Sequence, residues 1–103
     1  MKNKKWEEVG LIGVDAGLCW LGDPCYCVTP DADNHPTQTW IEFCDKLGKI
    51  EQKGVAQWNY KLGHVGLGVS VSTGYGDGNY PVFVRRNDEG RIAEVKVVFI
   101  EES

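Results

Sequence analysis

The sequence has no apolar run of membrane length and no recognisable export signal. None of its hydrophobic stretches approaches the roughly 20 residues that a membrane-spanning helix needs. The lysines near its start (Lys2, Lys4 and Lys5) are not followed by the apolar segment of a secretory signal peptide. We therefore expect a soluble, cytoplasmic protein without membrane association, in which residues 1–5 are disordered.

Positive charge is also scarce. The 11 Lys and Arg stand against 15 Asp and Glu, which gives a formal net charge of -4. Proteins that bind long nucleic acids carry a clustered lysine and arginine excess, because they neutralise backbone phosphates. The charge balance therefore argues against a long nucleic acid as partner, and it leaves a small polar ligand or a protein.

The four cysteines lack the spacing of a familiar metal site. Cys25 and Cys27 are one residue apart, whereas a zinc knuckle uses C-x2-C, and Cys19 and Cys44 lie further away. Without a secretory signal, nothing favours a disulfide framework. We expect free thiols and no cofactor, with zinc bound by Cys19, Cys25, Cys27 and Cys44 as the alternative.

What is present suits one small domain over residues 1–103, because 42% of the residues are hydrophobic and no internal repeat is visible. V-G-L-I-G-V-D (9–15) and L-C-W-L-G (18–22) predict two short strands joined by a tight turn at residues 15–17. Residues 25–28 predict one more brief extended segment. The polar stretch 29–37 predicts an exposed loop.

A helix is predicted from about Thr37 or Thr39 to Lys49, with Thr37 as N-cap and Glu42 near the first turn. The apolar positions at helical spacing are Trp40, Cys44 and Leu47. Residues 55–60 alternate loosely and predict a strand, and Gly63-His64 predicts a turn.

The final third alternates most clearly. Val65–Thr73, Tyr80–Arg86 and Arg91–Ile100 predict three strands, and S-T-G-Y-G-D-G-N-Y (72–80) predicts a hairpin turn between the first two. Together they predict a C-terminal three-stranded antiparallel meander. The fold class is therefore α+β: mainly antiparallel or sandwich-like sheet with one α-helix at about 37–49.

Two blocks of the sequence resemble an uncharacterised family of small bacterial and phage-borne proteins. Its members pair an early D-x-G…D-P block with a late G-x-G-D-G-x-Y-P-V block, and here these read D-A-G-L-C-W-L-G-D-P and G-Y-G-D-G-N-Y-P-V. The matching residues are Asp15, Gly17, Asp23, Pro24, Gly74, Gly76, Asp77, Gly78 and Tyr80. The resemblance implies a compact β-rich domain, neighbouring blocks and a phage or mobile-element origin, but no catalytic activity.

The glycine-rich turn is the first candidate site. Backbone N–H groups around Gly74, Gly76 and Gly78 can form an anion-binding concavity. A phosphate loop of the nucleotide-binding kind needs a helix after its glycines, whereas here a strand follows. The structural alternative is a tight turn in which glycines supply positive φ. The flanking Tyr75 and Tyr80 favour a binding surface.

The polar residues that the blocks bring together complete the predicted site. The predicted ligand-binding set is Asp15, Asp23, Tyr75, Asp77, Tyr80 and His64. Gathered carboxylates would suit calcium or magnesium, but the D-x-D-x-D spacing is missing. His64 could activate Cys25 or Cys27 as a nucleophile, yet no motif supports this geometry. We therefore predict no catalytic residue.

The tryptophans offer one further reading. Trp6, Trp20, Trp40 and Trp58 are expected to fill the core between helix and sheet. The W-N-Y of Trp58, Asn59 and Tyr60 could instead stack on a planar base, with Asn59 reading its edge.

These observations favour a non-catalytic binding domain that holds a small polar or nucleotide-like ligand, or a host partner protein, near the glycine-rich turn. One alternative is a small hydrolase or metal-dependent enzyme that uses Asp, His or Cys. The other is a homo-oligomeric interaction module whose edge strand pairs with a copy of itself. The sequence leaves these three readings open.

Overall fold

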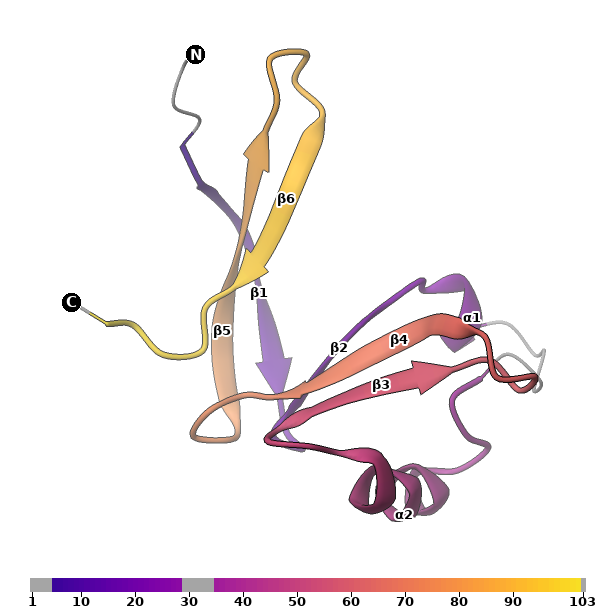
Figure 1. Ribbon diagram of the computed structural model, residues 1–103. Coiled ribbons are helices and arrows are strands. Elements are labelled where there is room, and N and C mark those ends of the chain that lie inside the picture. Colours follow the sequence, from indigo (N-terminus) through magenta and orange to yellow (C-terminus); the bar gives the residue numbers. More distant parts are fainter. Residues whose placement is uncertain (1–4, 29–34, 103) are drawn as a thin grey trace. The chain divides into compact units, whose positions relative to one another are not determined.

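The computed structural model describes residues 5–28 and 35–102, and they form a mainly antiparallel β structure with two helices (Figure 1). The elements in chain order are β1 (Glu7–Val14), β2 (Leu18–Gly22), α1 (Cys25–Val28), α2 (Trp40–Ile50), β3 (Val55–Asn59), β4 (Val65–Ser72), β5 (Gly78–Arg86) and β6 (Ile92–Val97). The predicted α+β class is confirmed. No helix among the described residues is both long and apolar enough to cross a membrane.

The strands form two three-stranded antiparallel sheets, with the orders β1-β5-β6 and β2-β4-β3. The chain divides into two compact units accordingly. The terminal unit comprises Met1–Gly17 and Thr73–Ser103 and contains the first sheet; the central unit, Leu18–Ser72, contains the second sheet and both helices. One domain over residues 1–103 stays a prediction. The predicted disorder of residues 1–5 falls, Lys5 apart, outside the described residues.

The predicted C-terminal meander is wrong in its first strand pair, that of β4 with β5. β4 pairs with β2 and β3, whereas β5 pairs with β1 and β6. Residues 72–80 therefore connect two sheets and are not a hairpin turn, and β1 and β2 likewise do not pair with each other. The physical reason is that alternation shows which residues share a buried face, but not which strand supplies the neighbouring backbone. The hairpin of β5 and β6 is present, closed by the Asn87 N–H and the Arg91 carbonyl at 2.8 Å.

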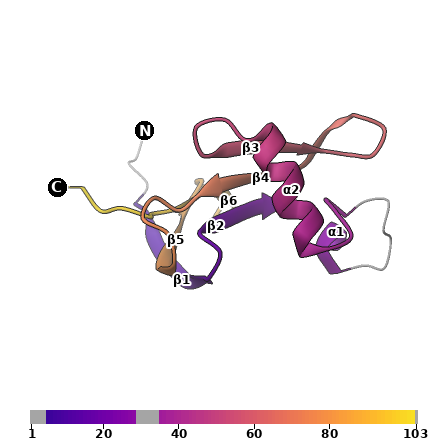
Figure 2. The ribbon, with the colours of Figure 1, turned by 90° about the horizontal axis from the view of Figure 1, so that it is seen from below.

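The helix α2 covers one face of the central sheet (Figure 2). Its N-cap is Thr39 and not the predicted Thr37: the Thr39 hydroxyl oxygen accepts the Glu42 N–H at 3.1 Å, whereas the Thr37 hydroxyl donates to the Thr39 carbonyl. The helical positions that pack on the sheet are Phe43, Leu47 and Ile50. Cys44, predicted on the apolar face, is exposed, because a one-residue step turns a side chain by about 100° around a helix.

The core of the central unit is aromatic. Trp58 is 1% exposed, and its ring stacks on Phe43 with 4.2 Å between centroids. The Trp58 indole N–H donates to the Ser70 hydroxyl at 2.9 Å, which satisfies a buried donor. Trp20 packs edge-on against both rings. The prediction that tryptophans fill the core is thus correct for Trp20 on β2 and Trp58 on β3, whereas Trp40 is 56% exposed.

The predicted extended segment at residues 25–28 is wrong, because it is the short helix α1. An Asp23 carboxylate oxygen accepts the Cys25 N–H at 2.9 Å, and the Asp23 carbonyl accepts the Tyr26 N–H at 3.1 Å. Pro24 suits a first helical position, since its missing N–H would have no partner there. An aspartate–proline pair that ends one strand thus also begins a helical turn.

Candidate functional site

The glycine-rich turn between β4 and β5 is closed by its own residues. Thr73 is completely buried, and its hydroxyl donates to the Gly76 carbonyl oxygen at 2.6 Å. The Tyr80 hydroxyl donates to the same oxygen at 2.5 Å. Gly74 and Gly76 have φ angles of 76° and 107°, which side chains rarely tolerate. The turn is therefore held by internal hydrogen bonds.

The chain after β6 packs against this turn. A Cβ on Gly74 would lie 2.9 Å from Cδ1 of Ile100, so the Ile100 side chain packs over this glycine and would have to shift for a larger residue. The Tyr80 ring meets Phe99 edge-on, with 5.3 Å between centroids. These contacts give the glycines and Tyr80 a structural role. Tyr75, by contrast, is 90% exposed.

The predicted ligand-binding residues belong to both units. Asp15, Tyr75, Asp77 and Tyr80 lie in the terminal unit, and Asp23 and His64 lie in the central unit. Asp15 and Asp77 are exposed, while Asp23 begins α1. His64 lies in the turn after β3, where its carbonyl accepts the Tyr60 N–H at 2.8 Å. A ligand-binding role for these six residues stays a prediction.

The cysteines are all free thiols. Cys19 is buried, and this burial raises the pKa of its thiol above the ordinary value of 9.0. Cys25, Cys27 and Cys44 are exposed. Within residues 5–28 and 35–102, no three His, Cys, Asp or Glu side chains lie close enough together to hold a metal ion. The alternative of a four-cysteine zinc site therefore gains no support from the geometry.

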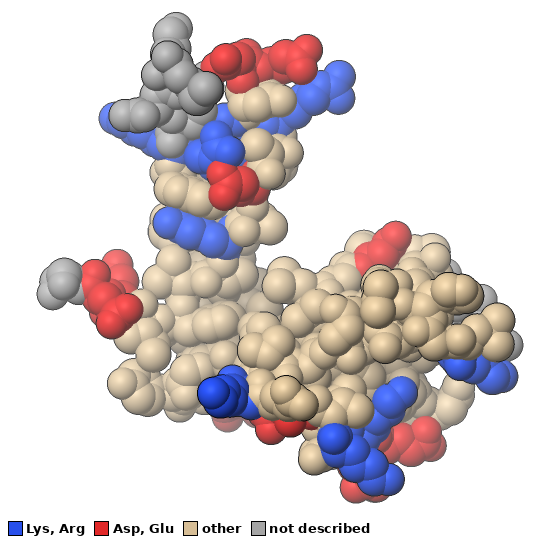
Figure 3. All heavy atoms as spheres, viewed as in Figure 1, with Lys and Arg blue, Asp and Glu red and all other residues tan. Residues whose placement is uncertain are grey.

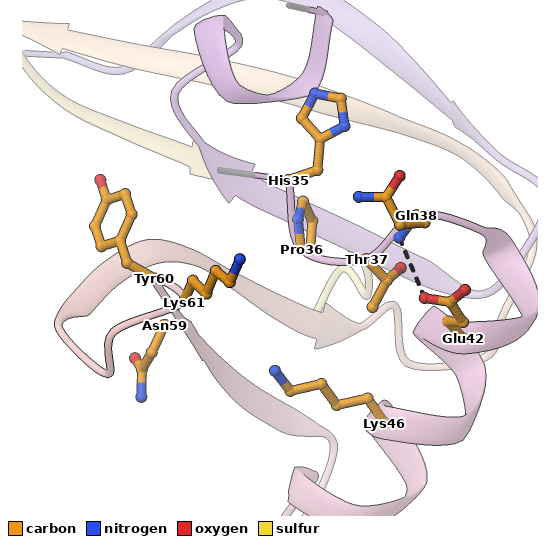
Figure 4. Close-up of a pocket in the computed structure, with 9 residues that line it drawn as sticks. All are labelled: His35, Pro36, Thr37, Gln38, Glu42, Lys46, Asn59, Tyr60 and Lys61. Carbon is orange, nitrogen blue, oxygen red and sulfur yellow. Dashed lines mark hydrogen bonds between the residues drawn. The ribbon is translucent and has the colours of Figure 1, made fainter. Parts of the chain in front are cut away.

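A polar surface pocket of about 390 Å³ lies within the central unit (Figure 4). Three segments form its walls: the chain before α2, the first turns of α2, and the end of β3 with the two residues after it. The residues that line it are His35, Pro36, Thr37, Gln38, Glu42, Lys46, Asn59, Tyr60 and Lys61. All but Pro36 carry a polar or charged side chain, so the pocket suits a polar ligand.

Local hydrogen bonds hold the wall formed by the start of α2. The Thr37 hydroxyl donates to the Thr39 carbonyl at 2.9 Å, and the Gln38 N–H donates to a Glu42 carboxylate oxygen at 3.4 Å. The Thr39 hydroxyl in turn accepts the Glu42 N–H. The side chains of Thr39 and Glu42 thus each satisfy a backbone donor near the start of the helix. This wall is preorganised by the N-cap of α2.

The opposite wall is the end of β3 and its turn. The Gly63 N–H donates to the Tyr60 carbonyl at 2.8 Å, which confirms the predicted turn at Gly63-His64. The Tyr60 ring meets Tyr26 of α1 edge-on at 5.6 Å. A side-chain hydrogen bond with Tyr60 raises the pKa of the Tyr26 hydroxyl. Tyr60 is thereby oriented at the pocket rim.

Two lysines extend into this pocket from different walls. Figure 4 shows the ammonium groups of Lys46, on α2, and Lys61, after β3, pointing into the same space. Lys46 Nζ also lies 5.6 Å from the centroid of the Trp58 ring. Among the described residues that line the pocket, Glu42 carries a carboxylate, and this group accepts the Gln38 N–H. The arrangement therefore suits an anionic or strongly polar ligand.

Sequence reasoning found part of this pocket for other reasons. Thr37 and Glu42 were noted as helix-start residues, and Asn59 and Tyr60 as a base-stacking motif. It missed Lys46 and Lys61, because two isolated lysines 15 positions apart form no motif. The sequence did hold one signal: W-N-Y is followed directly by Lys61 and then by a glycine turn, which places Lys61 at the end of a strand.

Comparison with known proteins relates this chain to a protein family. The family described as "Protein of unknown function (DUF4241)" matches residues 7–97, which is most of the chain. No curated protein and no solved structure matches it.

Proposed function

Since the chain belongs to the DUF4241 family, whose description assigns no activity, we propose from the pocket geometry that it is a non-catalytic binding domain for a small, negatively charged polar ligand. The expectation of an uncharacterised family is thereby met. A bacterial or phage origin, the two block motifs as family features and a cytoplasmic location are part of the proposal.

The observation that carries this proposal is the convergence of Lys46 and Lys61 on one pocket. Hydrogen bonds from ammonium groups to phosphate or carboxylate are stronger than neutral ones. Two lysines on separate walls can clamp one anionic group from both sides. The volume of about 390 Å³ lies within the roughly 300–1,000 Å³ typical of small-molecule sites.

The remaining lining residues favour a ligand that also has a planar polar part. Asn59 and Gln38 offer amide groups that can both donate and accept. Tyr60 offers an aromatic ring that its contact with Tyr26 keeps in place. A nucleotide combines an anionic group with a planar base, so it is the ligand class that this lining supports best.

The proposal moves the binding site away from the glycine-rich turn. The carbonyl of Gly76 there already accepts two hydroxyl donors, and the side chain of Ile100 packs against Gly74. The pocket beside α2, in contrast, joins cationic, amide and aromatic groups from three segments. A host protein as partner remains the other reading, and it would engage the same exposed lysines.

Calorimetric titration with ATP, GMP and inorganic pyrophosphate tests the proposal. Lys46→Gln and Lys61→Gln should each weaken binding at least about tenfold, which corresponds to roughly 1.4 kcal/mol. Lys49→Gln, on the same helix but outside the pocket lining, and Asp77→Asn, in the glycine-rich turn, should leave it unchanged. Equal weakening by Lys49→Gln, no binding of any probe, or turnover of a bound nucleotide would contradict the proposal.

A further inference from the structure

The outer edge of β6 is a strand edge without a partner among residues 5–28 and 35–102. In the sheet order β1-β5-β6, β6 pairs with β5 on one side only (Figure 1). Strand edges present unpaired backbone N–H and C=O groups to any strand that can align with them.

The hydrogen-bond pattern shows which residues of β6 point outward. The Val98 N–H donates to the Pro81 carbonyl at 3.2 Å, and the register continues with Val82 opposite Val97. In an antiparallel ladder every second residue bonds to the same neighbour. Glu94, Lys96 and Val98 therefore bond to β5. The backbone groups of Val95 and Val97 point to the free edge.

The side chains of β6 divide between two faces of the sheet. Val95 lies opposite Val84, and Val97 opposite Val82, so these four form an apolar face on which Val95 is still 54% exposed. Glu94 and Lys96 lie on the other face. The strand edge is thus bordered by an apolar face on one side and by alternating charge on the other.

The charges on β6 are held over its own sheet. Glu94 forms an ion pair with Arg85, and Lys96 Nζ lies 4.3 Å from the ring centroid of Trp6 and 5.5 Å from that of Phe83. Basic and acidic side chains lie side by side over the terminal unit in Figure 3. Lysines on edge strands commonly block pairing by projecting past the edge. Here Lys96 lies over its own sheet.

We propose that β6 pairs antiparallel with β6 of a second copy of this chain about a two-fold axis at Val95. Val95 then forms a hydrogen-bonded pair with its own copy. Glu94 faces Lys96 of the other copy in both directions, at a non-hydrogen-bonded position where opposite side chains are closest. The two three-stranded sheets become one six-stranded sheet, and the two-fold symmetry closes the assembly as a dimer.

Charge and strand geometry select this register over its neighbours. A two-fold axis at Lys96 would set two lysines directly opposite each other, which destabilises a strand pair. An axis at Ala93 would fall on a bulge, because Arg85 pairs with Glu94 and Arg86 already with Ile92. An axis at Val97 would pair the two strands only at their last residue, since β6 ends there.

The other edge strand, β1, is less suited to the same pairing. Its register shifts between Glu8 and Gly10, so Val9 forms a bulge in the strand. Bulges bend a strand and interrupt its edge. Gly10 and Gly13 also leave β1 with fewer side chains to pack against an added strand.

Sedimentation analysis of the full chain over a wide concentration range tests the proposal. The apparent mass should rise from that of one chain to that of two, with a dissociation constant in the micromolar range, because one strand pair gives a small interface. Val95→Pro should abolish the rise, since it removes an outward N–H that β5 does not use. A monomer at every concentration, or a dimer that survives Val95→Pro, would overturn it.

Charge exchange tests the register without relying on proline. Lys96→Glu and Glu94→Lys, each alone, should raise the dissociation constant about tenfold, because each sets like charges opposite each other. The double variant should restore it, whereas Lys49→Glu in the central unit should not change it. Circular dichroism and the unfolding midpoint check that each variant folds. Failure of the double variant to restore pairing, in a folded protein, would contradict an axis at Val95.

Discussion

The indole ring of Trp20 occupies the space that a side chain on Gly68 would need. A Cβ at position 68 would lie 2.6 Å from Cε2 of Trp20, and nearer still to Cζ2. A Cβ on Gly22 would lie 2.6 Å from Nε1 of the same ring. Because Trp20 is held between Phe43 and Trp58, it cannot move aside cheaply. Both glycines are therefore required by packing within the central unit.

Gly68→Ala should destabilise the protein by about 1–3 kcal/mol, the usual cost of overpacking a core. Gly48→Ala is the matched control: it lies in α2, and no atom lies within 4 Å of its added Cβ. Alanine there should stabilise the protein by about 0.5–1 kcal/mol, because it favours a helix more than glycine does. Urea unfolding measures both. The same sign for the two substitutions would contradict this account of Gly68.

Tyr80→Phe and Thr73→Val should each lower the free energy of unfolding by about 0.5–1.5 kcal/mol, because each removes a hydroxyl donor to the Gly76 carbonyl. Neither should change nucleotide affinity. Tyr75→Phe is the control, since Tyr75 is almost fully exposed. Loss of ligand affinity in the Tyr80 variant, at unchanged stability, would return the binding site to the glycine-rich turn.

Thr39→Ala should cost about 1 kcal/mol of stability, because it removes the N-cap acceptor for the Glu42 N–H. It should also weaken ligand binding, since the chain before α2 forms one wall of the pocket. Thr39→Ser keeps the acceptor and should preserve both properties. Chemical unfolding and calorimetric titration of the two variants give the comparison. Equal effects of alanine and serine would argue against the capping role.

Cys19 should react with a thiol reagent much more slowly than Cys25, Cys27 and Cys44, because it is buried and the others are exposed. Its pKa is raised in the folded state by desolvation of the thiolate. Between the two pKa values the folded protein keeps the Cys19 proton that the unfolded chain loses. The stability that the buried, protonated thiol contributes is therefore complete below the pKa of Cys19 in the unfolded chain. It is lost as the pH rises through the higher folded value.

Cys19→Ala should accordingly reduce the loss of stability above about pH 9, the ordinary thiol pKa. Unfolding midpoints between pH 7 and the alkaline range measure this. Cys44→Ala, an exposed thiol, serves as control. If Cys19→Ala and Cys44→Ala changed the loss of stability with rising pH by the same amount, burial of Cys19 would not be the cause of that loss.

The local elements were predictable because their signals are local. Threonine and glutamate near residue 40 mark a helix start, because their side chains can satisfy nearby backbone donors. The structure confirms this role for Glu42, but the N-cap is Thr39 and not the predicted Thr37. The alternation of β4 and β5 likewise marks strands wherever they pair. The prediction of an extended segment at Cys25–Val28 was wrong, because Asp23 and Pro24 end one strand and also start a helical turn.

Pairing between strands was not predictable from one sequence. The pattern of β4 would suit β5 as neighbour as well as it suits β2, and the choice depends on positions distant along the chain. Glu7, for example, pairs with Val84. The pocket was missed for a similar reason: Lys46 and Lys61 meet only because α2 packs on the central sheet. Residues that carry a recognisable motif, such as Gly74 and Tyr80, have contacts that hold the turn together.

The division of the chain has a consequence for the order of folding. Leu18 and Ser72, the two ends of the central unit, pair on neighbouring strands, so this continuous segment closes on itself. The terminal sheet cannot form until β5 has been synthesised, because β5 is the strand with which β1 pairs in the part of the chain that the structure describes. On the ribosome, β1 therefore emerges long before its partner does. The central unit can therefore fold first. Once Leu18 and Ser72 lie side by side in it, β1 and β5 of the terminal sheet are close enough along the chain to pair.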